Sequence, residues 1–190
     1  MTEQDNRLVE AASFAEMGQE YFDRGLLNEA IECYDQVLAI AHESGNRQLE
    51  WGVLDKLGVI NFMLGEFSKA VAHLEKSLAI SRVLRDPQRE GLALSHLAHS
   101  HMGLKDYRKA IEYYQIALPI LGETGERLEQ GHALFWMGWS LHNLGESKRA
   151  ITYMQQSLHV YTELDAKDAK DARALLAQWK KDPLAPRGRH

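Results

Sequence analysis

The stretch LGVINFMLGEFSKAVAHLEKSLAI, residues 57–80, decides the fold of this 190-residue chain. Its first part is densely apolar and ends at a turn marked by Gly65. From Phe67 onward, apolar residues recur at the i, i+3, i+4 and i+7 spacing of an amphipathic helix. The stretch therefore predicts two helices joined by a short turn.

The same arrangement returns every 40 residues, four times in all. A small residue marks each first helix and an alanine marks each second helix: Gly18, Gly58, Ala98 and Gly138, then Ala30, Ala70, Ala110 and Ala150. Repetition at this period indicates stacked two-helix units rather than a closed globular core. The paired small residues predict that the two helices of each unit cross closely.

The turns within the pairs repeat as well. Glycine at positions 25, 65 and 145 suits a left-handed helix end, whereas Lys105 takes this place in the third pair, so a different turn is open there. Asp86-Pro87 is typical of a helix start, with Asp as N-cap and Pro in the first turn. Pro119 lies late in a second helix, where it removes one backbone hydrogen bond.

The repeat resembles the tetratricopeptide repeat family, whose pattern is an apolar residue, Leu-Gly and Tyr in the first helix, then Ala and an aromatic residue in the second. The first copy carries this pattern at Phe14, Met17-Gly18, Tyr21, Ala30 and Tyr34. The later copies have Asn61, His101 and Leu141 in the Tyr place. The period of 40 residues exceeds the family's usual 34. In this respect the chain resembles the long-repeat branch of the family, which includes adaptors.

The resemblance implies an all-α fold, a right-handed α-solenoid of four helix pairs with a C-terminal capping helix. We expect one domain over residues 8–182 after an N-terminal segment, 1–7, and before a disordered tail, 183–190. The expected repeats are 8–46, 47–86, 87–126 and 127–165, and the capping helix is 166–181.

Composition narrows the function classes. The net charge is −5 and the pI about 6.0, so there is no basic excess for nucleic-acid binding. The chain has no signal pattern and no apolar run long enough to span a membrane, and its single Cys33 forms no internal disulfide. We therefore expect a cytoplasmic protein with no membrane partner.

The resemblance also implies that the first helices line a concave groove, which holds a protein or peptide partner. The partner-binding residues expected in the first two repeats are Gln19, Phe22, Asp23, Asp55, Phe62 and Met63. Those expected in the last two are Ser95, His96, His99, Met102, His132, Phe135, Trp136, Trp139, His142 and Asn143. The first half is acidic, and the second is aromatic and rich in histidine.

Phe135, Trp136 and Trp139 form the predicted main anchor, since aromatic side chains bury a large area at interfaces. The alternative is that these rings pack against the next repeat or the capping helix. The charged run at residues 167–171 is interpreted as a solvated helix face.

No catalytic or metal-binding pattern accompanies the repeats. Imidazoles at 96, 99, 132 and 142 could converge, but a zinc site needs three or four ligands of fixed geometry, and the sequence has no His-Glu-x-x-His and no Cys pair. It also has no Walker loop and no nucleophile elbow. We expect no cofactor, no metal and no enzyme activity. The predicted function is protein–protein interaction; the alternatives are a self-associating scaffold, such as a homodimer, and the regulatory subunit of an enzyme.

Overall fold

The computed structural model describes residues 3–181, so the tail predicted at 183–190 lies outside the described residues. Over the described range the chain is built from α-helices and contains no strand. The helices are 13 to 21 residues long and follow one another with short turns. The all-α solenoid class predicted from the repeat is confirmed.

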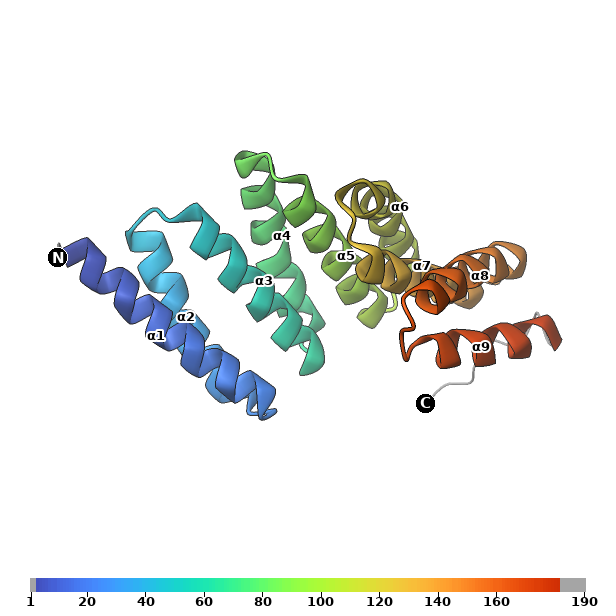
Figure 1. The fold of residues 1–190 in the computed structure, drawn as a ribbon, viewed down its shortest axis with the longest axis horizontal. Coiled ribbons are helices and arrows are strands. Elements are labelled where there is room, and N and C mark those ends of the chain that lie inside the picture. Colours follow the sequence, from blue (N-terminus) through green and yellow to red (C-terminus); the bar gives the residue numbers. More distant parts are fainter. Residues whose placement is uncertain (1–2, 182–190) are drawn as a thin grey trace. The chain divides into compact units, whose positions relative to one another are not determined.

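The chain divides into two compact units, Met1–Asp86 and Pro87–His190. In the first unit each helix packs against the next along the chain, as the blue to green part of Figure 1 shows. Its helices are α1 (Glu3–Asp23), α2 (Leu27–Glu43), α3 (Arg47–Met63) and α4 (Phe67–Leu84).

The second unit has two helix pairs and one further helix. Its helices are α5 (Pro87–Gly103), α6 (Tyr107–Thr124), α7 (Arg127–Asn143), α8 (Ser147–Glu163) and α9 (Ala169–Lys181). Consecutive helices pack together, α5 also contacts α7, and α9 packs on α8, as the yellow-green to red part of Figure 1 shows. The predicted capping helix corresponds to α9, which begins three residues later than predicted and ends at the predicted residue 181, and α1 begins before the predicted repeat start at residue 8.

The small residues lie where the helices of a pair cross. The four repeat alanines, Ala30, Ala70, Ala110 and Ala150, are fully buried. A Cβ atom on Gly58 would lie 2.5 Å from Cγ of Leu74 on the partner helix, and one on Gly138 would lie 3.1 Å from the carbonyl oxygen of Ala150. Close approach of the helices therefore depends on the absence of a side chain at these two positions.

The three residues in the Tyr place of the repeat are all buried. Asn61 Nδ2 donates a hydrogen bond of 2.7 Å to the carbonyl of Leu57, and the His101 ring stacks on Tyr113 with centroids 5.4 Å apart. Leu141 is fully buried. A buried amide, imidazole or alkyl chain thus fills the space that Tyr takes in the usual repeat.

Two local details differ from a simple repeat. Lys105 has a φ of 61°, so it adopts the left-handed conformation of the glycines that it replaces, and the third turn keeps the same backbone form. Pro119 lies inside α6, which continues to Thr124. None of the helices within residues 3–181 is both long and apolar enough to cross a membrane.

Candidate functional site

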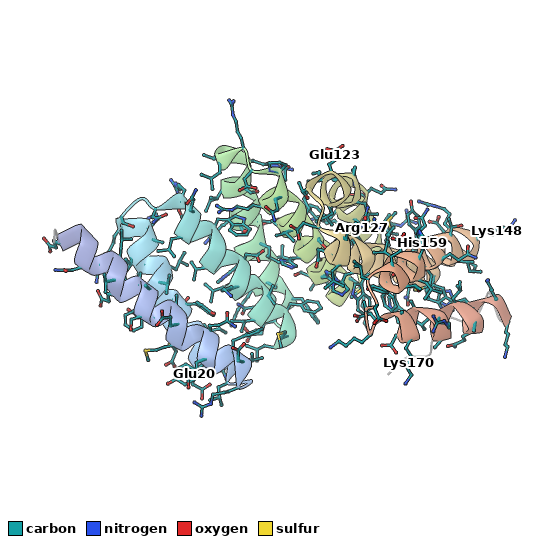
Figure 2. All side chains as sticks on the ribbon, viewed as in Figure 1. Glu20, Glu123, Arg127, Lys148, His159 and Lys170 are labelled. Carbon is teal, nitrogen blue, oxygen red and sulfur yellow. The ribbon has the colours of Figure 1, made fainter. Side chains whose placement is uncertain are left out.

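A pocket of about 280 Å³ opens in the second unit on the first-helix side of its repeats. Residues of α5, α7, α8 and the beginning of α9 line it: His99, His132, Phe135, Trp136, Tyr161, Asp168 and Asp171. Four of these, His99, His132, Phe135 and Trp136, belong to the partner-binding set expected from the sequence. Figure 2 shows the side chains of this part of the chain, with Arg127 at the start of α7 and Lys170 on α9.

Rings form most of the pocket wall. The Phe135 and Trp136 rings meet edge to face with centroids 4.9 Å apart, and His99 meets Trp136 edge to face at 5.8 Å. On the other side, the ring of Tyr161 lies 5.7 Å from His132 and 6.5 Å from Phe135. Such edge-to-face contacts fix ring orientation, so the wall is preorganised.

A buried carboxylate underlies this wall. Glu129, in the first turn of α7, accepts a 2.6 Å hydrogen bond from the hydroxyl of Ser95 on α5. Its other oxygen lies 3.4 Å from Nδ1 of His132, one turn further along α7. Nδ1 of His99 lies 3.1 Å from the carbonyl oxygen of Ser95. Glu129 thus connects the first helices of two successive repeats.

The protonation states follow from these contacts. Burial alone would raise the pKa of Glu129, but the hydrogen bond with His132, the charges of His96 and His99 and the Ser95 hydroxyl together lower it to about 2. The same hydrogen bond raises the pKa of His132 against the effect of burial. Burial lowers the pKa of His99 to about 4, so this imidazole is neutral at physiological pH.

The C-terminal end of α7 is covered by the capping helix. The ring of Trp179 on α9 stacks on His142 at 4.3 Å and lies 6.3 Å from Trp139. His142 is buried in consequence, while Trp139 is half-buried. Nδ2 of Asn143 donates a hydrogen bond to the carbonyl of Trp139 in its own helix. Of the three predicted anchor rings, Phe135 and Trp136 line the pocket and Trp139 packs toward α9.

The remaining expected residues of α5 lie outside the pocket wall. Ser95 is fully buried and contributes through Glu129. His96 and Met102 are half-buried. The structure therefore brings together residues from the middle of the first helices.

The first unit has a smaller pocket, of about 180 Å³. Phe22 and Asp55 of the expected set line it, together with Tyr34, Lys56, Val59 and Ile60. Beside it, Oε1 of Gln19 accepts hydrogen bonds from Lys56 Nζ, at 2.7 Å, and from the Tyr34 hydroxyl, at 3.4 Å. Nε2 of Gln19 donates to the exposed Asp23. Phe62 packs on Phe67, and Met63 is exposed at the end of α3.

Sequence reasoning missed four residues of the larger pocket region: Glu129, Tyr161, Asp168 and Asp171. Glu129 had one signal, an acid three residues before His132 on the same helix, which places the two side chains on one face. Tyr161 belongs to a second helix, and Asp168 was assigned to a solvated face. The structure instead places Asp168 half-buried in the pocket wall.

The side chains that line the pocket are aromatic rings, imidazoles and carboxylates. Within residues 3–181 no group of three or more His, Cys, Asp or Glu side chains could hold a metal ion. Glu129 is ionised and already hydrogen-bonded, so its carboxylate holds the residues of the pocket wall in place. Rings and carboxylates remain for contact with another molecule.

Stacked two-helix units with a preformed pocket on their first helices place the chain among helical-repeat interaction modules. The chain belongs to the tetratricopeptide repeat family, whose model matches residues 9–86 and 89–163. The resemblance inferred from the sequence is thereby confirmed. No curated protein sequence matches the chain.

Several solved structures share the fold. The apo form of RapI superposes with a TM-score of 0.83 at 15% identity, over 92% of this chain and 64% of that one. A Rap protein complexed with Competence and Sporulation Factor gives a TM-score of 0.78 at 17% identity, over 93% and 51%. A putative kinesin light chain from Podosopora anserina gives 0.76 at 17% identity, over 96% and 89%. The chain spans less than two thirds of the length of either Rap protein, and identities this low show the fold alone.

Proposed function

We propose that the chain is a non-enzymatic adaptor that captures a peptide or helical segment of a partner protein on the first helices of its repeats. The observation that carries the proposal is the pocket in the second unit, where Phe135 and Trp136 form a preoriented wall. Interface energy concentrates in a few aromatic anchors that fill or form such pockets. The first helices of the first unit add a smaller pocket of the same kind at Phe22.

Two further observations support a protein partner. Membership of the tetratricopeptide repeat family places the chain among modules that present extended surfaces to other proteins. One structural neighbour, a Rap protein, is complexed with Competence and Sporulation Factor.

Selection from a displayed random-peptide library tests the proposal. The wild-type chain should enrich a family of related peptides, and Trp136→Ala should weaken their binding by about tenfold or more, because loss of an aromatic anchor costs roughly 1.4 kcal/mol or more. Ile116→Ala is the matched control, since Ile116 is an exposed apolar residue of the second helix α6. Circular dichroism should show unchanged helicity in both variants.

The proposal fails in either of two cases. One is that no related peptides are enriched by the wild-type chain. The other is that Trp136→Ala binds the enriched peptides as well as Ile116→Ala does.

A further inference from the structure

We propose that the pocket of the second unit recognises the guanidinium group of an arginine side chain in the partner. This inference deepens the proposed function by naming the chemistry that one pocket selects. It rests on three properties of the pocket: the nature of its walls, the charge at its rim and its size.

The walls suit a planar cation. Trp136, Phe135 and Tyr161 present aromatic rings to one small space. The face of an aromatic ring attracts a cation, and Trp does so most strongly. Arginine stacks on such faces more readily than lysine, because its guanidinium is flat and weakly hydrated.

The rim is acidic. Asp168 and Asp171 line the pocket at the start of α9, and neither carboxylate makes an ion pair within residues 3–181. The two aspartates lie one helical turn apart, so both carboxylates can accept hydrogen bonds from the N–H groups of one guanidinium. The exposed Lys167 and Lys170 neighbour them in the sequence but do not line the pocket.

The imidazoles of the pocket offset this charge only in part. Glu129, through its hydrogen bond and its charge, and Asp168, through its charge, both raise the pKa of His132, so one imidazole faces more than one carboxylate. The His132 ring contacts Glu129, which carries the charge opposite to protonated His132. The His99 ring is half-buried, packs against Trp136 and Tyr114, and is neutral at physiological pH. The two aspartates therefore set the sign of the local charge, and a cation is the complementary ligand.

The size points to one side chain. At about 280 Å³ the pocket lies just below the range of roughly 300–1,000 Å³ that holds drug-sized ligands. One arginine side chain, entering between the rings with its guanidinium at the aspartates, suits a space of this size. The rest of the partner would then lie along the first helices of the second unit, α5 and α7.

A titration with a small probe tests this inference without the partner. N-acetyl-arginine amide carries its charge on the guanidinium alone, and N-acetyl-citrulline amide is its neutral isostere. We expect the arginine probe to shift the indole N–H signal of Trp136 in a ¹H–¹⁵N NMR spectrum, with a dissociation constant in the millimolar range typical of so small a ligand. Trp136→Phe assigns the signal.

The double variant Asp168→Asn/Asp171→Asn should weaken binding of the arginine probe by about fivefold or more, since two partly exposed acids are lost. Asn at position 168 retains the ability to cap α9, so the fold should persist. The matched control, Asp35→Asn/Glu123→Gln, removes two exposed acids from second helices and should leave binding unchanged.

Equal binding of the citrulline probe, absence of any shift at Trp136, or an undiminished affinity of the aspartate variant would each overturn the inference. The two proposals can fail separately. Arginine binding without enriched library peptides would support the pocket's selectivity and contradict peptide capture, whereas enriched peptides with no arginine response would do the reverse.

Discussion

At the residue scale, the backbone turns left-handed at every twentieth position. Positive φ angles occur at Gly25, Gly45, Gly65, Arg85, Lys105, Gly125, Gly145 and Asp165. Each ends one helix before the next begins. Five of the eight are glycines, which adopt this conformation without steric cost, whereas Arg85, Lys105 and Asp165 bear that cost.

Replacing Lys105 by glycine should therefore stabilise the chain. We expect a gain of about 0.5–1 kcal/mol in the free energy of unfolding, because the strain of a side chain at positive φ is relieved. Lys76→Gly, on the exposed side of α4, is the control and should cost about 1 kcal/mol. Urea unfolding followed by circular dichroism measures both, and a loss of stability in Lys105→Gly would contradict the turn geometry.

Two glycines of α3 should respond oppositely to alanine. At Gly58 a Cβ atom would lie 2.5 Å from Leu74, a buried residue, so Gly58→Ala should destabilise by about 1–2 kcal/mol after the gain in helix propensity. A Cβ atom on Gly52 would meet no atom within 4 Å other than those of its chain neighbours and of its own helix backbone, so Gly52→Ala should stabilise by about 0.5–1 kcal/mol. Thermal melting of the two variants compares them directly, and equal shifts would show that helix crossing does not depend on Gly58.

Stability should fall in mild acid because of His99. Its pKa is lowered to about 4 in the folded chain, so the unfolded chain binds more protons between about pH 6.5 and pH 4. Because the folded chain holds His99 in its neutral form, the free energy of unfolding is highest above pH 6.5. It decreases progressively as the pH falls from about 6.5 to about 4. Glu129, His96 and His132 face the ring, and Glu129 adds its own loss only below its unfolded pKa of about 4.5.

The check is a comparison of wild type with His99→Gln by urea unfolding at a series of pH values. Wild type should lose about 1–3 kcal/mol more than the variant between pH 6.5 and pH 4. Parallel pH profiles would show that His99 is not the group responsible.

At the element scale, the buried ring of Trp179 anchors α9 to the end of α7. Trp179 is almost fully buried and stacks on His142, while Ala172, Leu175 and Leu176 complete its apolar face. Because this helix closes the last repeat, it covers residues that would otherwise meet solvent. The predicted capping role of the C-terminal helix is thus explained by specific contacts.

Trp179→Ala should destabilise the second unit by about 3–5 kcal/mol, the usual range for removal of a buried Trp. Amide hydrogen exchange should accelerate in α9 and at the end of α7. Lys180→Ala, next to it and exposed, should leave exchange unchanged. Slow exchange of α9 in Trp179→Ala would mean that the helix docks without this ring.

The elements could be predicted from the sequence because each copy of the repeat supports the others. Ala70 alone is unremarkable, but its register with Ala110 and Ala150 identifies the second helix and its buried face. The site was harder to predict, since its wall combines positions from different copies. Tyr161 enters through the packing of α8 on α7, and Asp168 lies just before α9, which packs on α8. No repeat register encodes either position.

Which first-helix residues are buried was only partly predictable, because their burial depends on contacts with other elements. His142 occupies a first-helix position, yet Trp179 stacks on it and buries it. Ser95, also in the expected set, is fully buried, and its hydroxyl donates a hydrogen bond to Glu129. Position on the first helix therefore indicates a candidate surface, and neighbouring elements decide which residues remain exposed.

At the scale of the whole molecule, packing is local. Within each of the two units, helices contact their neighbours along the chain, and in the second unit α5 also contacts α7. The net charge of −5 favours partners with basic segments. An arginine in the partner would be attracted by the negative charge of the chain and would contact the aromatic rings of the pocket in the second unit.

Site-specific photo-crosslinking in the native cell extract tests the central claim most directly. A photoreactive residue placed at Met102, on the first helix α5, should crosslink one recurring partner protein, and Trp136→Ala in the same chain should abolish the product. The same group at Gln115 or Gln155, exposed on the second helices α6 and α8, should not capture that protein. Equal capture from second-helix positions, or a product containing only a second copy of this chain, would contradict the account.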